Sequence, residues 1–88
     1  MENKILIKLN LPELDICFDI FIPVNEVVWK IKKLLIKSIS DLMDVSLNLN
    51  DEYLLINRDT GNVYNNNDIV INTDIRNSTE LFLISSEH

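Results

Sequence analysis

The residues with the strongest potential for nucleophilic chemistry are one cysteine and one histidine, and their spacing does not favour a catalytic pair. Cys17 lies in an alternating segment with Asp15 and Asp19 two residues away on either side, and the only histidine is His88. A catalytic cysteine acts as a thiolate, which a neighbouring base or cation stabilises. Two carboxylates disfavour that anion. We therefore do not expect Cys17 to be a nucleophile.

No metal or cofactor site is expected either. A single cysteine cannot supply the several thiolates of a zinc site or the four ligands of an iron–sulfur cluster. The acidic pair Asp51-Glu52 lacks the spaced oxygen ligands and central glycine of a calcium loop. The lone Gly61 does not make a phosphate-binding loop, which needs several glycines beside a lysine. These residues predict a protein that is not an enzyme and has no small-molecule substrate.

Composition and charge predict one compact domain, residues 1–88. The chain has 88 residues, of which 47% are hydrophobic, and one glycine, which is too apolar and too poor in breakers for a disordered segment. Its net charge of −6 argues against nucleic-acid binding, because phosphate affinity needs clustered lysine and arginine. Lys4 and Lys8 interrupt the apolar N-terminus, so we expect no signal peptide and no membrane insertion. With one cysteine, a reducing, cytoplasmic location fits best.

Two periodicities indicate the elements that would carry a site. Apolar residues alternate strictly over residues 4–11 and 15–22, which predicts two half-buried strands joined as an antiparallel hairpin. After Pro23 the period changes to 3.6 and predicts a helix, with Asn25 accepting hydrogen bonds from its first free amides. The expected buried face of that helix consists of Val27, Val28, Ile31, Leu34, Leu35, Ile39 and Leu42.

Three further strands are expected, at residues 53–57, 63–64 and 80–85, with a turn at 58–62. The order is then β-β-α-β-β-β. Handedness rules favour insertion of the last strand parallel to the first. The predicted fold class is therefore α+β, with a mixed sheet packed on one helix.

The segment "VYNNNDIVINTDIRNSTELFLIS", residues 63–85, resembles the closing half of ubiquitin-like (β-grasp) domains. It has a short strand, a polar turn, an apolar Val70, an Ile75 after one helical turn and a final alternating strand. Among such domains, residues 4–85 most resemble the YukD/EsaB-like accessory proteins of bacterial type VII secretion systems. The resemblance implies a protein-interaction role and a larger component of that machine as partner, with a homodimer as the other possibility.

The helix has more apolar residues than one buried face needs. Trp29 and Ile36 point away from the expected stripe, Met43 lies beside them, and Lys32 and Lys33 flank them. One interpretation is that residues 44–52 fold over the three apolar side chains. Another is a protein contact site, with an aromatic anchor rimmed by lysines. Simple exposure is the third.

The sheet offers a second candidate surface. If its inner face packs on the helix, Leu6, Phe82 and Ile84 must face outward, joined by one of Leu54 and Leu55. Contiguous outward apolar side chains usually mark a binding surface. By resemblance, Phe82 and Ile84 occupy last-strand positions of the recognition patch of ubiquitin-like domains.

Two alternatives of other classes remain open. One is a small modifier or sulfur carrier, which would need a flexible Gly-Gly tail where this sequence reads Ile84-Ser85-Ser86-Glu87-His88. The other is a self-assembling structural protein.

Overall fold

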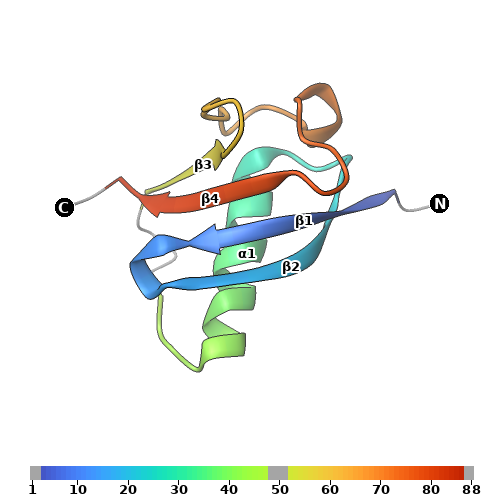
Figure 1. Ribbon diagram of the computed structural model, residues 1–88. Coiled ribbons are helices and arrows are strands. Elements are labelled where there is room, and N and C mark those ends of the chain that lie inside the picture. The colour runs from blue at the N-terminus through green and yellow to red at the C-terminus, as the bar shows by residue number, and fades with distance from the viewer. Residues whose placement is uncertain (1–2, 48–51, 87–88) are drawn as a thin grey trace.

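The structure, a computed structural model, describes residues 3–47 and 52–86. In this part of the chain a four-stranded sheet packs on one long helix, with strand order β2-β1-β4-β3 (Figure 1). This arrangement confirms the predicted α+β fold. The elements in chain order are β1 (Lys4–Leu11), the 3-10 turn η1 (Pro12–Leu14), β2 (Ile16–Pro23), α1 (Val28–Met43), β3 (Tyr53–Asn57), the 3-10 turn η2 (Val70–Asn72) and β4 (Glu80–Ser85).

The first and last strands lie side by side at the centre of the sheet. β1 pairs with β4 in parallel, as expected, and Leu9 is opposite Leu81. β2 pairs with the other side of β1, and β3 with the other side of β4, both antiparallel. The sheet is therefore mixed, and its centre is made from the two ends of the chain.

The prediction of a strand at residues 63–64 is wrong, because these residues form only an isolated β-bridge. Val63 forms only an isolated bridge with Ile56, and Tyr64 N donates to Leu55 O at 3.1 Å. A turn begins at the next residue: Asp68 N donates to Asn65 O at 3.0 Å, and Asn65 N donates to the Asp68 carboxylate. These bonds divert the chain before a longer ladder forms on β3.

The core lies between the sheet and α1 and is built by the predicted alternation. Its completely buried side chains come from all four strands, from the helix and from the 70–75 segment. Burial of such side chains contributes about 1.5–3 kcal/mol each. The largest of the fully buried residues are Ile7, Leu9, Leu11, Ile22, Val28, Ile31, Leu35, Ile39, Leu55, Ile75, Leu81 and Leu83.

The start of α1 is held by a distant loop and not by Asn25. The N-cap position is Val27, and no side chain caps it. Instead, Val28 N donates to Asp68 O at 2.8 Å and Trp29 N donates to Asn66 O at 3.1 Å. Backbone carbonyls of the 65–68 turn thus satisfy amides that every helix leaves free at its N-terminus. The predicted side-chain cap is wrong because tertiary contacts supply the acceptors.

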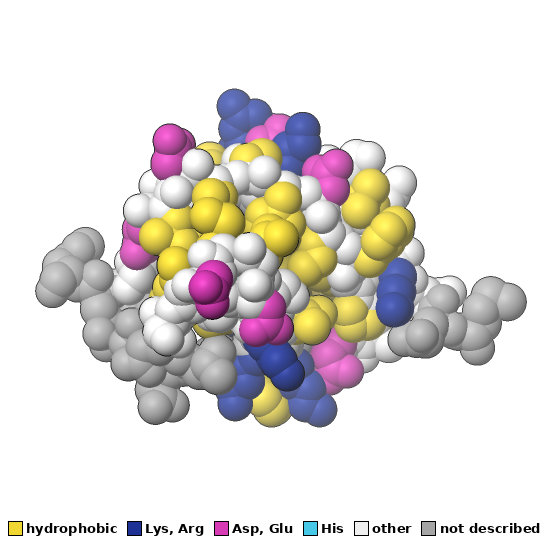
Figure 2. Space-filling model, turned by 90° about the horizontal axis from the view of Figure 1, so that it is seen from below, with side chains coloured by type: hydrophobic (Ala, Val, Ile, Leu, Met, Phe, Trp, Pro, Cys, Tyr) yellow, Lys and Arg dark blue, Asp and Glu magenta, His cyan; other side chains and the backbone are white. Residues whose placement is uncertain are grey.

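The buried face of α1 is rotated from the predicted one. Ile36 is 2% exposed and belongs to the core, whereas Leu34 and Leu42 are 39% and 63% exposed. Figure 1 shows the reason: the helix crosses the strands, and its last turns extend past β2, where no strand lies against them. Seen from below, in Figure 2, apolar side chains gather over this end of the molecule. The overhang leaves Leu42 uncovered.

This rotation makes a direct prediction about stability. We expect Ile36→Ala to lower the free energy of unfolding by about 2–4 kcal/mol, because it leaves a cavity in the core. Leu34→Ala, the matched change two residues earlier, should cost less than about 1 kcal/mol. Urea unfolding followed by circular dichroism measures both. Equal losses would contradict the observed orientation of the helix.

Candidate functional site

The outer face of β3 and β4 carries a group of large apolar side chains. Leu54 lies opposite Ile84, and Ile56 lies opposite Phe82, in adjacent antiparallel rows. All four side chains are half-buried. The helix lies on the opposite face of the sheet (Figure 1). We call Leu54, Ile56, Phe82 and Ile84 the β3–β4 patch.

The predicted outward orientation of Phe82 and Ile84 is confirmed, and of Leu54 and Leu55, one of which was expected to face outward, it is Leu54 that does. Phe82, Ile84 and Leu54 are on the outer face. Leu55 is 0% exposed and packs in the core, so it cannot contact a partner. Successive strand residues point to opposite faces, and the register with Leu83 puts Leu55 on the helix side.

Leu6 faces outward as expected but does not join the β3–β4 patch. On β1, the residue in register with Phe82 is Asn10. Leu6 lies beyond the start of β4, where its N–H donates to Asn77 Oδ1 at 2.9 Å and its carbonyl accepts from Ser78 N at 2.7 Å. Its apolar neighbour is instead Phe21 of β2, which is 61% exposed.

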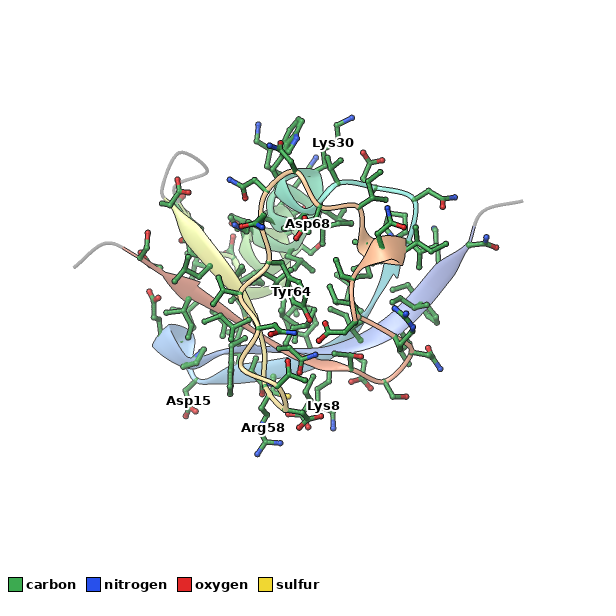
Figure 3. The ribbon with its side chains drawn as sticks, turned by 90° about the horizontal axis from the view of Figure 1, so that it is seen from above. Lys8, Asp15, Lys30, Arg58, Tyr64 and Asp68 are labelled. Carbon is green, nitrogen blue, oxygen red and sulfur yellow. The ribbon has the colours of Figure 1, made fainter. Side chains whose placement is uncertain are left out.

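A charged band separates Leu6 and Phe21 from the β3–β4 patch. Lys8 is in register with Asp19 on one side and Glu80 on the other. Arg58 Nη1 contacts the Glu80 carboxylate at 3.1 and 3.2 Å. Figure 3 shows Lys8 and Arg58 projecting on the same side of the molecule. The outer face therefore has two apolar areas separated by charged side chains. The sequence contained a sign of this band, because Lys8 lies two residues from Leu6 on β1 and Glu80 lies two residues from Phe82 on β4, so all four residues had to share the outer face.

Trp29, the second candidate, lies beside a small depression at the β3 side of α1. Its side chain is 39% exposed, and the Nζ atoms of Lys30 and Lys33 lie 5.4 and 5.2 Å from its ring centroid, within cation–π range. The depression has a volume of about 110 Å³, well below the 300–1,000 Å³ typical of small-molecule sites. Its lining residues are Trp29, Lys32, Lys33, Ile36, Glu52, Tyr53 and Asn66.

Lys32 contributes to this depression as a partly buried group. Its Nζ donates to Asn66 Oδ1 at 2.7 Å. Burial lowers the pKa of Lys32 below its usual value, and the nearby Glu52 carboxylate offsets part of that effect. Lys32 thus ties α1 to the 65–68 turn, while Lys33 lies on the exposed surface.

Of the three extra apolar side chains on α1, only Ile36 is buried, and it belongs to the core between the sheet and the helix. Ile36 is buried, so its predicted exposure as a contact residue is wrong. Met43 is 41% exposed and Trp29 stays partly open. Residues 48–51 of the 44–52 segment, which one interpretation folds over these side chains, lie outside the described residues.

A polar network that no pattern in the sequence predicts lies beside the end of β3. Buried Asn57 accepts from Asp59 N and Thr60 N, which closes the 58–61 turn, and its Nδ2 donates to Tyr64 Oη at 3.1 Å. Tyr64 donates in turn to Asp74, which also accepts from Asn62 Nδ2. Figure 3 shows Tyr64 pointing toward the middle of the molecule. No short motif signals such a network, because its members are brought together only by the fold.

This network shifts two pKa values. Burial, followed by the hydrogen bond to Asp74, raises the pKa of Tyr64, and the hydrogen bond from Tyr64 is the main cause that lowers the pKa of Asp74. Both shifts favour a neutral phenol that donates to an ionised carboxylate at neutral pH.

Two properties of the described residues concern metal binding and membrane insertion. Among residues 3–47 and 52–86, no group of three or more metal-binding side chains comes together. Over the same residues, no helix has the length and apolar character to cross a bilayer.

Comparison with known proteins places the fold. No protein-family model matches the chain, and no curated protein matches it. Solved structures do. The N-terminal ubiquitin-like domain of the 4931431F19Rik protein is 22% identical with a TM-score of 0.71, over 100% of this chain and 80% of that one. The EccD5 ubiquitin-like domain from Mycobacterium xenopi is 13% identical with a TM-score of 0.69, over 98% of both chains.

A third similar structure is a chain of the MycP5-free ESX-5 inner membrane complex. It is 11% identical with a TM-score of 0.69, over 97% of this chain and 21% of that chain. At these identities the comparisons establish a ubiquitin-like fold and nothing finer.

The polar network predicts a pH-dependent stability. Because its folded-state pKa is depressed, Asp74 contributes stability that is present above its ordinary pKa of 3.8 and is lost as pH falls through the folded value. Tyr64→Phe should lower the free energy of unfolding by about 1 kcal/mol at neutral pH, because it removes the hydrogen bond to that carboxylate. The difference from wild type should shrink at lower pH. Urea unfolding at several pH values measures it, and a difference that is constant with pH would contradict the assignment. An Asp74→Asn background is the control, and there the pH dependence of the difference should vanish.

Proposed function

We propose that this chain is a non-enzymatic, ubiquitin-like protein-interaction module that docks onto a larger protein through the β3–β4 patch. The observation that carries this proposal is the placement of Leu54, Ile56, Phe82 and Ile84 in two adjacent rows on the sheet face opposite the helix. A contiguous outward apolar surface with a polar border is typical of a protein-binding site. The Arg58–Glu80 pair forms part of that border, at 3.1 Å.

We further propose that the larger protein is a component of a bacterial type VII secretion system and that the chain acts in the cytoplasm. The resemblance of residues 4–85 to YukD/EsaB-like proteins supports this role. So does the similarity in fold to the EccD5 ubiquitin-like domain and to a chain of the ESX-5 inner membrane complex. A second copy of this chain is the other occupant that the patch could accept.

The exposed side of Trp29 is a second contact within the same proposal. Lys30 and Lys33 hold their ammonium groups over its ring, and this arrangement favours an acidic or polar group on the partner. Tryptophan is enriched among the residues that dominate binding energy. Ile36 is buried in the core, so it makes no contact with the partner in this proposal.

A matched pair of substitutions tests the docking surface. Phe82→Asp places a charge in the β3–β4 patch, whereas Phe21→Asp makes the same change on the same sheet face, beyond the charged band. In the source organism, deletion of the gene should reduce export of the proteins that the type VII secretion system secretes, without reducing their cellular level. Complementation with Phe21→Asp should restore secretion, and complementation with Phe82→Asp should leave it at least tenfold lower, a loss of about 1.4 kcal/mol in binding.

Ile84→Asp, near the end of β4, is a second variant of the patch, to be used if Phe82→Asp does not fold. Circular dichroism and sedimentation of the purified variants establish that each is folded and show whether the wild-type patch forms a dimer. Normal secretion from the deletion strain would overturn the secretion role. Normal secretion with both folded patch variants would instead overturn the patch as the docking surface.

A further inference from the structure

The two edges of the sheet differ in how well they are protected. Beside β3, Asn57 N donates to Asn62 O at 2.9 Å and Tyr64 N to Leu55 O at 3.1 Å, so the chain itself covers that edge. β2 is the opposite edge, and it pairs only with β1. Within residues 3–47 and 52–86, no backbone group bonds to its free side. The open edge lies at the lower side of the molecule in Figure 1.

β2 also lacks the devices that usually blunt an open edge. Proteins protect edge strands by shortness, lysines, prolines or bulges. β2 is eight residues long, has no lysine, and has a proline only at its last position. Its register with β1 runs from Lys4 opposite Pro23 to Leu11 opposite Ile16 without a bulge. Such an edge is suited to accept another strand.

The hydrogen-bond alternation identifies which groups are available. Val24 N donates to Asn3 O at 3.0 Å, so alternate residues from that pair onward bond to β1. The remaining residues Cys17, Asp19 and Phe21 therefore direct their N–H and C=O groups to the open side. They offer three donors and three acceptors along a straight strand.

Apolar surface lies next to this edge. The last turns of α1 overhang β2, with Leu34 and Leu42 exposed, and Val45 just after the helix is 38% exposed (Figures 1 and 2). On the helix-facing side of β2, Phe18 and Ile20 are only partly buried. One more strand beside β2 would lie under the overhang and cover these side chains.

The charges around the edge select the kind of strand. Asp19 is the only charged residue of β2, and Asp15 precedes the strand. Asp41 and Asp44 lie at the overhanging end of α1. Two cations offset part of this negative charge: Lys8 is in register with Asp19, and Lys37 lies one helical turn before Asp41. Complementarity therefore favours a basic segment.

We propose that the β2 edge binds an extended segment of another protein, about five to seven residues long, in which apolar residues alternate with lysine or arginine. The segment adds a strand beside Cys17, Asp19 and Phe21. Its apolar side chains lie under the α1 overhang, and its basic side chains lie on the outer face by Asp19. Strand addition of this kind gives affinity through main-chain bonds and specificity through alternate side chains. The site is separate from the β3–β4 patch and does not depend on it.

A second copy of this chain fits the edge less well. Antiparallel pairing of two β2 strands would bring together two acidic strands that have no lysine or arginine. Each chain also has a net charge of −6. Like charges across a strand pair are destabilising.

A designed peptide tests the proposal on the full chain. The probe is the acetylated, amidated heptapeptide Lys-Val-Lys-Ile-Lys-Val-Lys, and the control replaces every lysine with glutamate. Amide hydrogen exchange by NMR should show at least tenfold slower exchange at Cys17, Asp19 and Phe21 when the basic peptide is present. Exchange at Phe18 and Ile20, whose amides already bond to β1, should change little. The acidic peptide should have no effect.

Two variants separate this site from the β3–β4 patch. Leu42→Lys removes an apolar side chain of the overhang and adds a positive charge, so it should weaken binding of the basic peptide at least tenfold. Leu54→Asp alters the patch and should leave peptide binding unchanged. Absence of the alternating protection at about 1 mM peptide, about ten times a Kd of 0.1 mM and so enough for tenfold slowing, would overturn the proposal. Equal binding of the acidic peptide would do so as well. Protection that rises with protein concentration alone would mean that a second copy occupies the edge.

Discussion

The parallel pairing of β1 with β4 is the constraint on which the rest of the structure depends. Its three register pairs join residues about seventy positions apart, for example Leu9 with Leu81, so the chain must close on itself before either strand has its central partner. This closure decides what each face of the sheet presents. A slip of one residue would move Leu81 and Leu83 out of the core and turn Phe82 inward. The core and the β3–β4 patch are therefore two results of one register.

The sequence predicts the elements well because strand and helix periodicities are local properties. Alternation correctly places Ile7 and Leu83 inside and Phe82 and Ile84 outside. It cannot state which residues become neighbours across strands. The predicted contact of Leu6 with the patch fails for that reason, since the register sets Asn10 and not Leu6 beside Phe82. Leu54 and Leu55 show the same limit, because parity separates them but only the pairing with β4 says which one faces out.

Tertiary contacts also override the local signals of the helix. Asn25 is a favourable capping residue by type, yet the carbonyls of Asn66 and Asp68 reach the first amides of α1. The helical period predicts a buried stripe that includes Leu42, but the sheet under α1 is narrower than the helix is long (Figure 1). Leu42 therefore fits the apolar pattern and still lacks a surface to cover it, while Ile36 is enclosed on the β3 side. The apolar residues at the C-terminal end of α1 are exposed because the helix extends past the edge of the sheet, which the sequence pattern does not show.

The strand order gives the module two sides with different chemistry. The β3–β4 patch is a face of side chains with little free backbone, because β3 is paired with β4 and bridged by residues 62–64. The β2 edge is the reverse, with free backbone groups beside apolar side chains of the overhang. In the two proposals, a protein on the patch lies against the outer face of the sheet, whereas a strand on the β2 edge lies in the plane of the sheet, at the end of the strand order away from β3. The charged band formed by Lys8, Asp19, Glu80 and Arg58 lies between the two sites. The two proposed sites therefore do not overlap.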